Sequence, residues 1–263
     1  MNIFVCIKQV PDVNAPLQIK DGRLIQDSDR MMLNAYDASA VEEALVLAEE
    51  GEGTVTVVLV GPEKAGETIR KALAMGADQG VHIRRPAEDE ERETFDSAVY
   101  ARVLAAFFAG RDKEYDFIFC GKQAQDTDAG LTGGMLAEHL GLPYATNAVG
   151  LDFEDGKLIV KRQGDGGQEV LELPSPGLVT CSNDMNEPRI PSLKGIMQSK
   201  RKPVESLNLD DLNLDRNSLQ ANTRVLGYEE KAEREAGEKF EGEPDEIARK
   251  VARLLDEEAN VLE

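Results

Sequence analysis

The sequence contains no tryptophan, only two histidines and only three cysteines among its 263 residues. The cysteines, Cys6, Cys120 and Cys181, lie far apart, and each falls within or at the end of an apolar stretch. This spacing fits neither a zinc site nor a disulfide framework. It predicts three buried, reduced thiols in a cytoplasmic protein.

Long apolar runs and an excess of basic residues are also lacking. No stretch approaches the length of about 20 apolar residues that a membrane helix needs, so no membrane insertion is expected. The N-terminus, MNIFVCIKQVPD, begins directly with a strand pattern and leaves no room for a signal peptide. With 30 basic and 50 acidic residues, the formal net charge is −20. Such a charge argues against nucleic acid and anionic membranes as partners, because both would repel the chain.

The first half of the chain shows a regular alternation of strand and helix patterns. Asn34 or Asp37 can cap the first helix, and a small hairpin is expected around Asp21-Gly22. The alternation predicts a doubly wound, mostly parallel sheet, and therefore an α/β fold class. The predicted strands are 3–8, 54–60, 80–83 and 115–120, and the predicted helices are 38–50, 68–75, 94–109 and 135–140.

A glycine-rich acidic loop, GKQAQDTDAGLTGG, occupies residues 121–134 between a predicted strand and a predicted helix. Open α/β sheets bind nucleotides at such a position, because the first backbone amides of the helix point toward the ligand. Gly130, Gly133 and Gly134 would let the backbone approach a phosphate. The alternative interpretation is a plain turn that connects strand and helix.

The motifs of common catalytic sites, including GxSxG, HExxH, CxxC and GxxxxGK[ST], are absent from the sequence. His82 and His139 have no nucleophile motif beside them, and we expect both to be structural. The pairs Asp126/Asp128 and Asp210/Asp211 could hold a metal, but the first pair in such a loop more often fixes loop shape or a ribose. The residues alone indicate a nucleotide-binding protein without catalytic machinery of its own.

The pattern changes from about Thr146. Turn signals at Asp155-Gly156 and around Gly166 separate alternating apolar and polar segments, which predict antiparallel strands appended to the parallel sheet. The last part of the chain is irregular and polar until a helical pattern begins near Pro244. We expect this tail to be an extended C-terminal arm that packs on another chain, and a solvated tail is the alternative. The apolar stripe of its helix is Ile247, Val251, Leu254 and Leu255.

Six segments, in the same order along the chain, resemble the beta subunit of electron transfer flavoprotein. The resemblance covers nearly the whole chain to about Leu209 and resumes weakly in the tail. It implies a Rossmann-like sheet of the adenine nucleotide alpha hydrolase-like type, a nucleotide-binding domain over residues 1–205 and the arm over 206–263. The segments are VCIKQVPD, LNAYDASAVEEAL, GPEKAGETIRKALAMGAD, GKQAQDTDAGLTG, VKRQGDGGQEVLELPSPGLVTC and NEPRIPSLKGIMQSKRKPVE.

The resemblance also implies the function. Members of this family pair with an alpha subunit, and the heterodimer carries one redox-active FAD that is held mostly by alpha. The complex takes electrons from acyl-CoA dehydrogenases or related flavoenzymes and passes them to a quinone oxidoreductase or another acceptor. The beta subunit is a carrier component and not an enzyme, since the redox chemistry resides in the FAD.

The beta subunit of this family buries an AMP, or a second FAD in electron-bifurcating relatives. Gly130 and Leu131 stand where AMP-holding members often have polar side chains, which leaves backbone amides and Thr132 as phosphate donors. The sequence from Thr127 to Gly134, TDAGLTGG, looks more like the AMP kind than the FAD kind. Tyr36 matches an aromatic position near the flavin of the alpha subunit. The candidate cofactor-binding residues are Cys6, Lys8, Asn34, Tyr36, Val60, Ala124, Asp126, Thr127, Gly130, Leu131 and Thr132.

Residues 186–203 are similar to the segment with which the family grips its redox partners. A short helix after Pro191-Ser192 would place Leu193, Ile196 and Met197 on one side, with several lysine and arginine residues nearby. Leu193 looks like the family's anchor residue. The alternative is a local helix packed on its own domain.

Two functions of other classes are alternatives to the carrier subunit. A stand-alone adenine-nucleotide enzyme of the ATP-pyrophosphatase kind needs a Ser-Gly-Gly loop after the first strand, where this chain has Lys8-Gln9-Val10-Pro11-Asp12. A nucleotide-sensing stress-type module is usually shorter and lacks the hairpin block and the tail. The resemblance along the whole sequence favours the carrier subunit.

Overall fold

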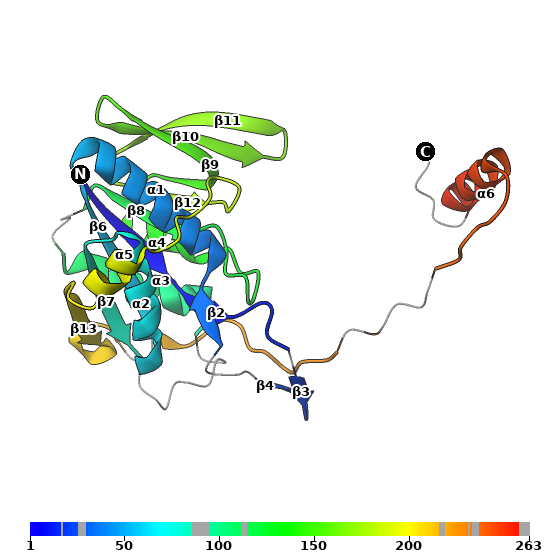
Figure 1. Cartoon of the computed structure of the whole chain (residues 1–263). Helices are drawn as coiled ribbons and strands as arrows, with labels where there is room; N and C mark the ends of the chain where they lie inside the picture. The colour runs from blue at the N-terminus through cyan, green and yellow to red at the C-terminus, as the bar shows by residue number, and fades with distance from the viewer. Residues whose placement is uncertain are drawn as a thin grey trace. The chain divides into compact units, whose positions relative to one another are not determined.

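A computed structural model of the chain describes residues 1–16, 18–25, 30–85, 95–111, 115–215, 219–230, 232 and 237–257. The chain divides into two compact units, Met1–Tyr228 and Glu229–Glu263. The first unit is an α/β structure on a nine-stranded sheet with the order β11-β10-β9-β12-β8-β1-β6-β7-β13 (Figure 1). The doubly wound, mostly parallel fold class that the sequence predicts is confirmed.

The centre of the sheet is strand β1 (Asn2–Ile7), which pairs in parallel with β6 on one side and β8 on the other. Every residue from Ile3 to Ile7 is buried. Such a continuous apolar run is typical of a parallel strand that is covered on both faces. The other parallel strands are β6 (Thr54–Gly61), β7 (Gln79–Arg84), β8 (Phe117–Gly121), β12 (Gly177–Cys181), β13 (Val204–Asn208) and the first part of β9 (Tyr144–Glu154).

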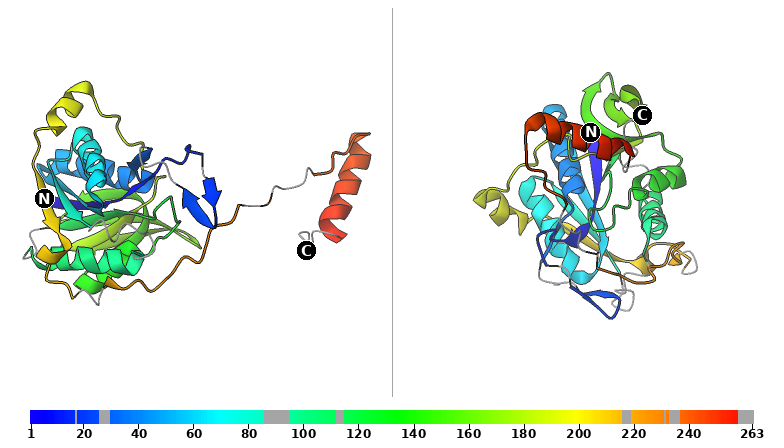
Figure 2. Two further views of the ribbon diagram at one scale, coloured as in Figure 1. Left: turned by 90° about the horizontal axis from the view of Figure 1, so that it is seen from below. Right: turned by 90° about the vertical axis from the view of Figure 1, so that its right-hand side faces the viewer.

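Helices cover both faces of this sheet. Helices α1 (Ala35–Gly51) and α2 (Gly66–Met75) lie on one face, and α3 (Ser97–Ala109) and α4 (Thr132–Leu140) lie on the other (Figure 2). Two separate hydrophobic cores result, because successive strand residues point to opposite faces. Val5 belongs to the core under α1 and α2, whereas Phe4 belongs to the core under α3 and α4.

Helix α3 begins later than the sequence indicates. We expected it from about Thr94, which lies outside the described residues, but it starts at Ser97. Asp96 is its N-cap, and the carboxylate accepts hydrogen bonds from the backbone amides of Ala98 (3.1 Å) and Val99 (3.0 Å). The side chain satisfies amides that the first turn of a helix otherwise leaves without partners, which fixes the start of the helix.

The antiparallel block is confirmed in part. β9, β10 (Lys157–Gly164) and β11 (Gly167–Pro174) form two consecutive hairpins. Asp155 and Gly156 have φ angles of 49° and 81°, as the tight turn between β9 and β10 requires. The prediction is wrong for β12, which runs parallel between β8 and β9. All five of its residues are buried, so it is an interior strand and not part of a hairpin.

Smaller elements complete the first unit. Two pairs of short strands are antiparallel, β2 (Gln9–Pro11) with β5 (Met31–Leu33) and β3 (Gln18–Lys20) with β4 (Arg23–Ile25). The second pair is the predicted hairpin at Asp21-Gly22, both of which have positive φ angles. Short helices within the described residues include η1 (Glu63–Ala65), α5 (Leu193–Ser199) and η4 (Leu209–Asp211).

The second unit contains helix α6 (Pro244–Glu257), at the position that the apolar stripe predicts. None of its residues is buried. Among the described residues, no helix combines the length and the apolar character needed to cross a membrane. The division of function at residue 205, and the packing of the arm on another chain, stay predictions.

Candidate functional site

A cavity of about 1260 Å³ opens at the carboxyl edge of the parallel sheet. Its floor is made by the ends of β1, β6 and β8, and its walls include the first residues of α3 and α4. Ligand cavities typically have volumes of roughly 300–1,000 Å³, so this one is large enough for a nucleotide.

The cavity lies where the winding of the sheet reverses. From β1 the chain proceeds outward to β6 and β7, and then returns to the other side of β1 with β8 and β12. The loops after β1 and β8 therefore diverge and leave a crevice between them. Open α/β sheets bind ligands at this topological switch point.

The glycine-rich loop forms one wall of the cavity and is held in shape by its own contacts. The backbone amide of Ala124 donates to the carbonyl oxygen of Ala129 at 3.2 Å, and Asp128 adopts a left-handed φ of 51°. The Lys8 ammonium group forms an ion pair with Asp126 at 2.8 Å, with side chains only 28% and 14% exposed. Lys8 thus ties the loop to the end of β1, and its charge is already balanced by a carboxylate.

The start of α4 is the strongest anion-binding feature in the cavity. Its N-cap residue, Leu131, makes no side-chain capping hydrogen bond, and no acidic residue occupies the first turn. The first amides of a helix carry a partial positive charge, so an uncapped start facing a cavity favours a phosphate. Gly133 serves packing as well, since a Cβ atom there would lie 2.5 Å from Cγ2 of Thr180 in β12.

Asp37 joins the two strand ends at the floor of the cavity. Its buried carboxylate accepts hydrogen bonds from the backbone amides of Lys8 (2.7 Å) and Gly121 (3.0 Å). Burial raises the pKa of this carboxyl group to about 7, although the hydrogen bonds that it accepts lower the pKa. The side chain therefore fixes the distance between the loops after β1 and β8.

Comparison with known proteins decides the family. The chain matches the electron transfer flavoprotein domain family over residues 22–212. The electron transfer flavoprotein subunit beta of Bacillus subtilis is 37% identical over 262 residues, which cover all of both chains. The subunit beta of Homo sapiens is 36% identical over 252 residues, which cover 95% of this chain and 96% of the relative. The chain belongs to the family of electron transfer flavoprotein beta subunits.

A third relative is named for a different complex. It is the caffeyl-CoA reductase-Etf complex subunit CarD of Acetobacterium woodii. It is 37% identical over 216 residues, which cover 81% of this chain and 80% of the relative.

The structure of this family member brings ten of the eleven predicted cofactor-binding residues together. Tyr36 is the exception, because it does not line the cavity and is half-buried on α1, beside Gly121. The residues that line the cavity are Cys6, Lys8, Asn34, Val60, Ala124, Asp126, Thr127, Gly130, Leu131 and Thr132.

Neither Asn34 nor Asp37 caps α1 with its side chain, contrary to expectation. Asn34 occupies the N-cap position, but its amide group donates to the carbonyl oxygen of Gln123 (2.8 Å) and accepts from the amide of Gln125 (3.1 Å). The side chain of Gln125 accepts instead from the amide of Ala35 at 2.9 Å. Polar groups at the start of α1 and in the glycine-rich loop thus form hydrogen bonds with each other. The spacing of residues in the sequence cannot reveal these contacts.

The three cysteines are all buried and unpaired, as predicted. Cys6 and Cys120 stand opposite each other on β1 and β8, and both line the cavity. A hydrogen bond with Cys120 and burial raise the pKa of the Cys6 thiol well above its ordinary value. The thiol is therefore protonated at neutral pH and serves as an apolar wall of the cavity rather than as a nucleophile.

The remaining polar candidates have structural surroundings. His82 is buried in β7, with Nε2 3.1 Å from the carbonyl oxygen of Pro62, and burial lowers its pKa. In the described part of the chain, no group of three or more histidine, cysteine, aspartate or glutamate side chains is arranged to hold a metal ion.

A segment that the sequence did not indicate closes one side of the cavity. We call residues 221–228 the strap, and Asn222, Thr223, Val225 and Tyr228 of this segment line the cavity. The carboxylate of Asp96 accepts hydrogen bonds from the backbone amides of Asn222 (2.7 Å) and Thr223 (3.0 Å). Asp96 thus caps α3 with one oxygen and holds the strap with the other.

Residues 186–203, which we name the docking segment after the role predicted for them, contain the expected short helix as α5. The Ser192 hydroxyl caps it by accepting from the amide of Gly195 at 3.1 Å. Leu193 is 76% exposed, Met197 65% and Ile196 45%. The helix packs on α2, as the alternative interpretation expects, and its apolar side chains are exposed; the docking role stays a prediction.

Proposed function

We propose that the chain is the beta subunit of a heterodimeric electron transfer flavoprotein, that it pairs with an alpha subunit and that its cavity holds a structural AMP. The uncapped start of α4 at the topological switch point carries this proposal. In this proposal the phosphate lies at the start of α4, and the base contacts apolar groups that line the cavity, such as Val60 and Cys6. The chain acts as a carrier and not as an enzyme.

The redox chemistry in this proposal comes from an FAD held mostly by the alpha subunit. The residues of this chain bind the AMP, help to enclose the flavin and dock the redox partner. Electrons enter from acyl-CoA dehydrogenases or related flavoenzymes and leave to a quinone oxidoreductase or another acceptor. A cytoplasmic location accompanies this function as a further prediction.

A second candidate is the beta subunit of an electron-bifurcating complex, with a second FAD in the same cavity. Two observations favour it: the cavity volume of about 1260 Å³ is above the roughly 300–1,000 Å³ typical of ligand cavities, and one relative is a subunit of a caffeyl-CoA reductase-Etf complex. In either case the phosphate groups would lie at the start of α4.

The test is a nucleotide count on the chain purified together with its alpha subunit. The complex is denatured, and the released nucleotides are separated by chromatography and quantified per heterodimer. One FAD and one AMP would support the simple carrier. Two FAD and no AMP would contradict the AMP assignment and support the bifurcating complex. The absence of any nucleotide beyond one FAD would contradict both.

The docking segment supplies a prediction about partner choice. Replacing Leu193 with alanine should raise the KM for the flavoprotein in reduction by an acyl-CoA dehydrogenase by about 30-fold. That factor corresponds to about 2 kcal/mol, the loss typical of a buried interface anchor. Nucleotide content should not change, because Leu193 does not line the cavity. An unchanged KM would contradict the anchor role.

A further inference from the structure

The docking segment is not held to the protein by apolar packing. Ile190, Leu193 and Met197 are 92%, 76% and 65% exposed, and Ser199 is the only buried residue of α5. A short helix has little stability of its own in water. Some other interaction must therefore keep α5 in place with its apolar side chains turned outward.

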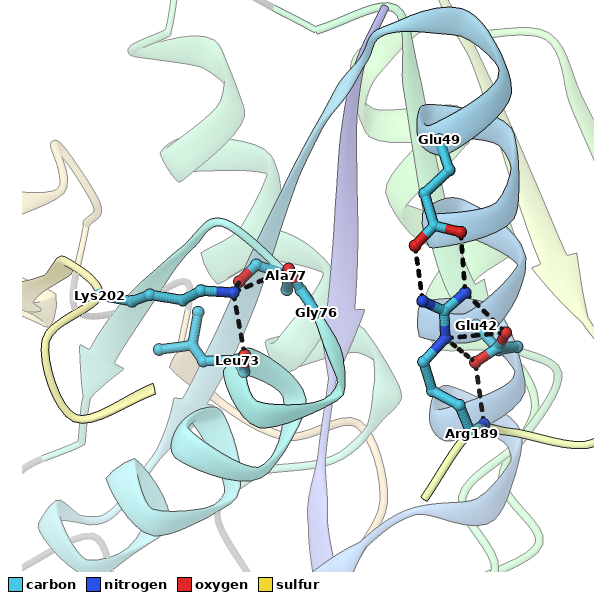
Figure 3. A network of polar contacts seen from close by, with 7 residues as sticks. All are labelled: Glu42, Glu49, Leu73, Gly76, Ala77, Arg189 and Lys202. Carbon is cyan, nitrogen blue, oxygen red and sulfur yellow. Dashed lines mark hydrogen bonds and ion pairs between the residues drawn. The ribbon is translucent and has the colours of Figure 1, made fainter. Parts of the chain in front are cut away.

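Arg189 fixes the first end of the segment to helix α1 (Figure 3). Its guanidinium group donates to both oxygens of Glu42, at 2.9 to 3.1 Å, and to both oxygens of Glu49, at 2.6 and 3.2 Å. The backbone amide of Arg189 also donates to Glu42 at 2.9 Å. Hydrogen bonds to Glu49 and Glu42 raise the pKa of Arg189 above its ordinary value.

This contact is more than a surface ion pair. The side chain of Glu42 is only 10% exposed, and the planar guanidinium group matches two carboxylates at once. Loss of the arginine would leave a nearly buried carboxylate without its cation, which is costly. The segment can therefore leave α1 only by breaking a network of several charged hydrogen bonds.

Lys202 fixes the other end of the segment to helix α2 (Figure 3). Its ammonium group donates to the carbonyl oxygens of Leu73 (3.1 Å), Gly76 (2.9 Å) and Ala77 (2.7 Å). These carbonyl groups belong to the last turn of α2 and the two residues that follow it, where the helix end carries partial negative charge. The contact thus stabilises the helix end and binds the segment at the same time.

Between the two ends, α5 lies directly against the backbone of α2. A Cβ atom at Gly195 would lie 2.5 Å from the carbonyl oxygen of Ala74. In return, Arg70 of α2 donates to the carbonyl oxygens of Ser199 (2.6 Å) and Lys202 (2.8 Å). Polar contacts therefore determine both the position and the orientation of α5.

We infer that Arg189 and Lys202 are positioning residues for partner docking. They hold the segment on α1 and α2, so that Leu193, Ile196 and Met197 are presented in one conformation before a partner arrives. The fitting partner is a flavoprotein with an apolar pocket, and a preformed segment loses less conformational entropy on binding. This inference rests on the proposed docking function and adds the residues that make it effective.

The experiment compares Arg189→Ala with Arg201→Ala. Arg201 is an exposed cation in the same segment, so both variants remove one positive charge from it. The heterodimer of each variant is reduced by an acyl-CoA dehydrogenase and its substrate. We expect Arg189→Ala to raise KM about ten-fold with kcat unchanged, Arg189→Lys to restore part of the loss, and Arg201→Ala to change KM much less. Equal effects of the two alanine variants would overturn the inference.

A double-mutant cycle with Leu193→Ala separates positioning from direct contact. If Arg189 acts through the apolar side chains, Arg189→Ala should add little to the KM of the Leu193→Ala variant. Full additivity would overturn the inference. If Leu193→Ala itself leaves KM unchanged, the docking function fails, and the position of the segment is then tested by amide exchange.

Amide hydrogen exchange tests the clamp without any partner. We expect residues 190–201 to exchange at least ten-fold faster in Arg189→Ala than in Arg201→Ala, with β1 and β8 unchanged. Lys202→Met and Lys200→Met form a second matched pair, because Lys200 is exposed on the same segment. Unchanged exchange in the segment in both Arg189→Ala and Lys202→Met would overturn the inference, whatever the partner assay shows.

Discussion

A buried carboxyl group at the floor of the cavity couples proton binding to stability. The pKa of Asp37 is raised from 3.8 to about 7 in the folded chain by burial. Between these values the folded state binds the proton more strongly than the unfolded state. The contribution of the protonated Asp37 side chain to the free energy of unfolding is therefore fully present below pH 4 and is lost as pH rises toward 7.

We expect Asp37→Asn to remove this pH dependence. As pH rises from 5 to 7, the wild type should lose stability relative to the variant. The loss in free energy of unfolding should be up to about 1.4 kcal/mol per pH unit. Urea unfolding at pH 5, 6, 7 and 8 measures it. His82 titrates in both proteins and cancels in the difference, so curves that run parallel would contradict the prediction.

Two adjacent glycines in the first turn of α4 have different neighbours. A Cβ atom at Gly133 would lie 2.5 Å from Thr180, whereas at Gly134 it would lie 3.7 Å from Tyr144. Gly133→Ala should therefore lower the free energy of unfolding by about 1–3 kcal/mol through overpacking. Gly134→Ala should raise it by about 0.5–1 kcal/mol, since alanine is a better helix residue. Chemical unfolding of both variants checks this, and similar values would contradict it.

At the scale of elements, the strap is expected to control nucleotide release. In Asp96→Asn the side-chain oxygen still caps α3, but the new amide group faces the amides of Asn222 and Thr223 and cannot accept from them. Loss of charged hydrogen bonds, worth about 1.5–3 kcal/mol, should speed nucleotide dissociation by about ten-fold or more. A chase with excess unlabelled nucleotide measures the rate.

The control for the strap is Thr223→Val, which removes only the hydroxyl group that contacts Asp96 at 3.2 Å. It should have a smaller effect, because the backbone amides keep their acceptor. Unchanged dissociation in Asp96→Asn, with the helix content intact, would contradict a role for the strap.

Elements with local determinants could be predicted from the sequence. Asp21-Gly22 and Asp155-Gly156 specify tight turns by themselves, because few other residue pairs adopt their positive φ angles. Strand β12 could not be assigned in this way, since its parallel orientation depends on β8, which is distant in the sequence. Buried interior strands carry no alternation that would reveal their direction.

Some features of the candidate site could likewise be predicted from the sequence, and others could not. The glycine-rich loop could be found because its composition and its place after a strand are both visible in the sequence. The contacts of Asn34 and Asp96 could not, because each side chain binds a segment that the fold alone brings near. Arg189 likewise cannot be distinguished in the sequence from the other basic residues of its segment, because the two carboxylates that it contacts come from α1.

At the scale of the whole molecule, helix α6 belongs to a second unit and buries no residue of its own. Its apolar stripe includes Val251 and Leu254, which an interface with the alpha subunit would cover. Val251→Asp should raise the Kd of the heterodimer at least about ten-fold, because it places a charge in an apolar interface. Arg249→Asp, an exposed position of the same helix, is the matched control, and sedimentation measures both. Equal Kd values would contradict the arm as an interface.

The docking segment also has a particular place in the path of the chain. It makes up most of the connection between β12, inside the sheet, and β13, the outermost strand beside β7. The amide of Gly80 in β7 already donates to Pro203, the residue that precedes β13. The segment is thus connected to the sheet at both of its ends. A large movement of the segment would pull on β13, the edge strand of the sheet. In the proposed docking, reach toward a distant partner must therefore come from movement of whole subunits, while α5 keeps its position on α2.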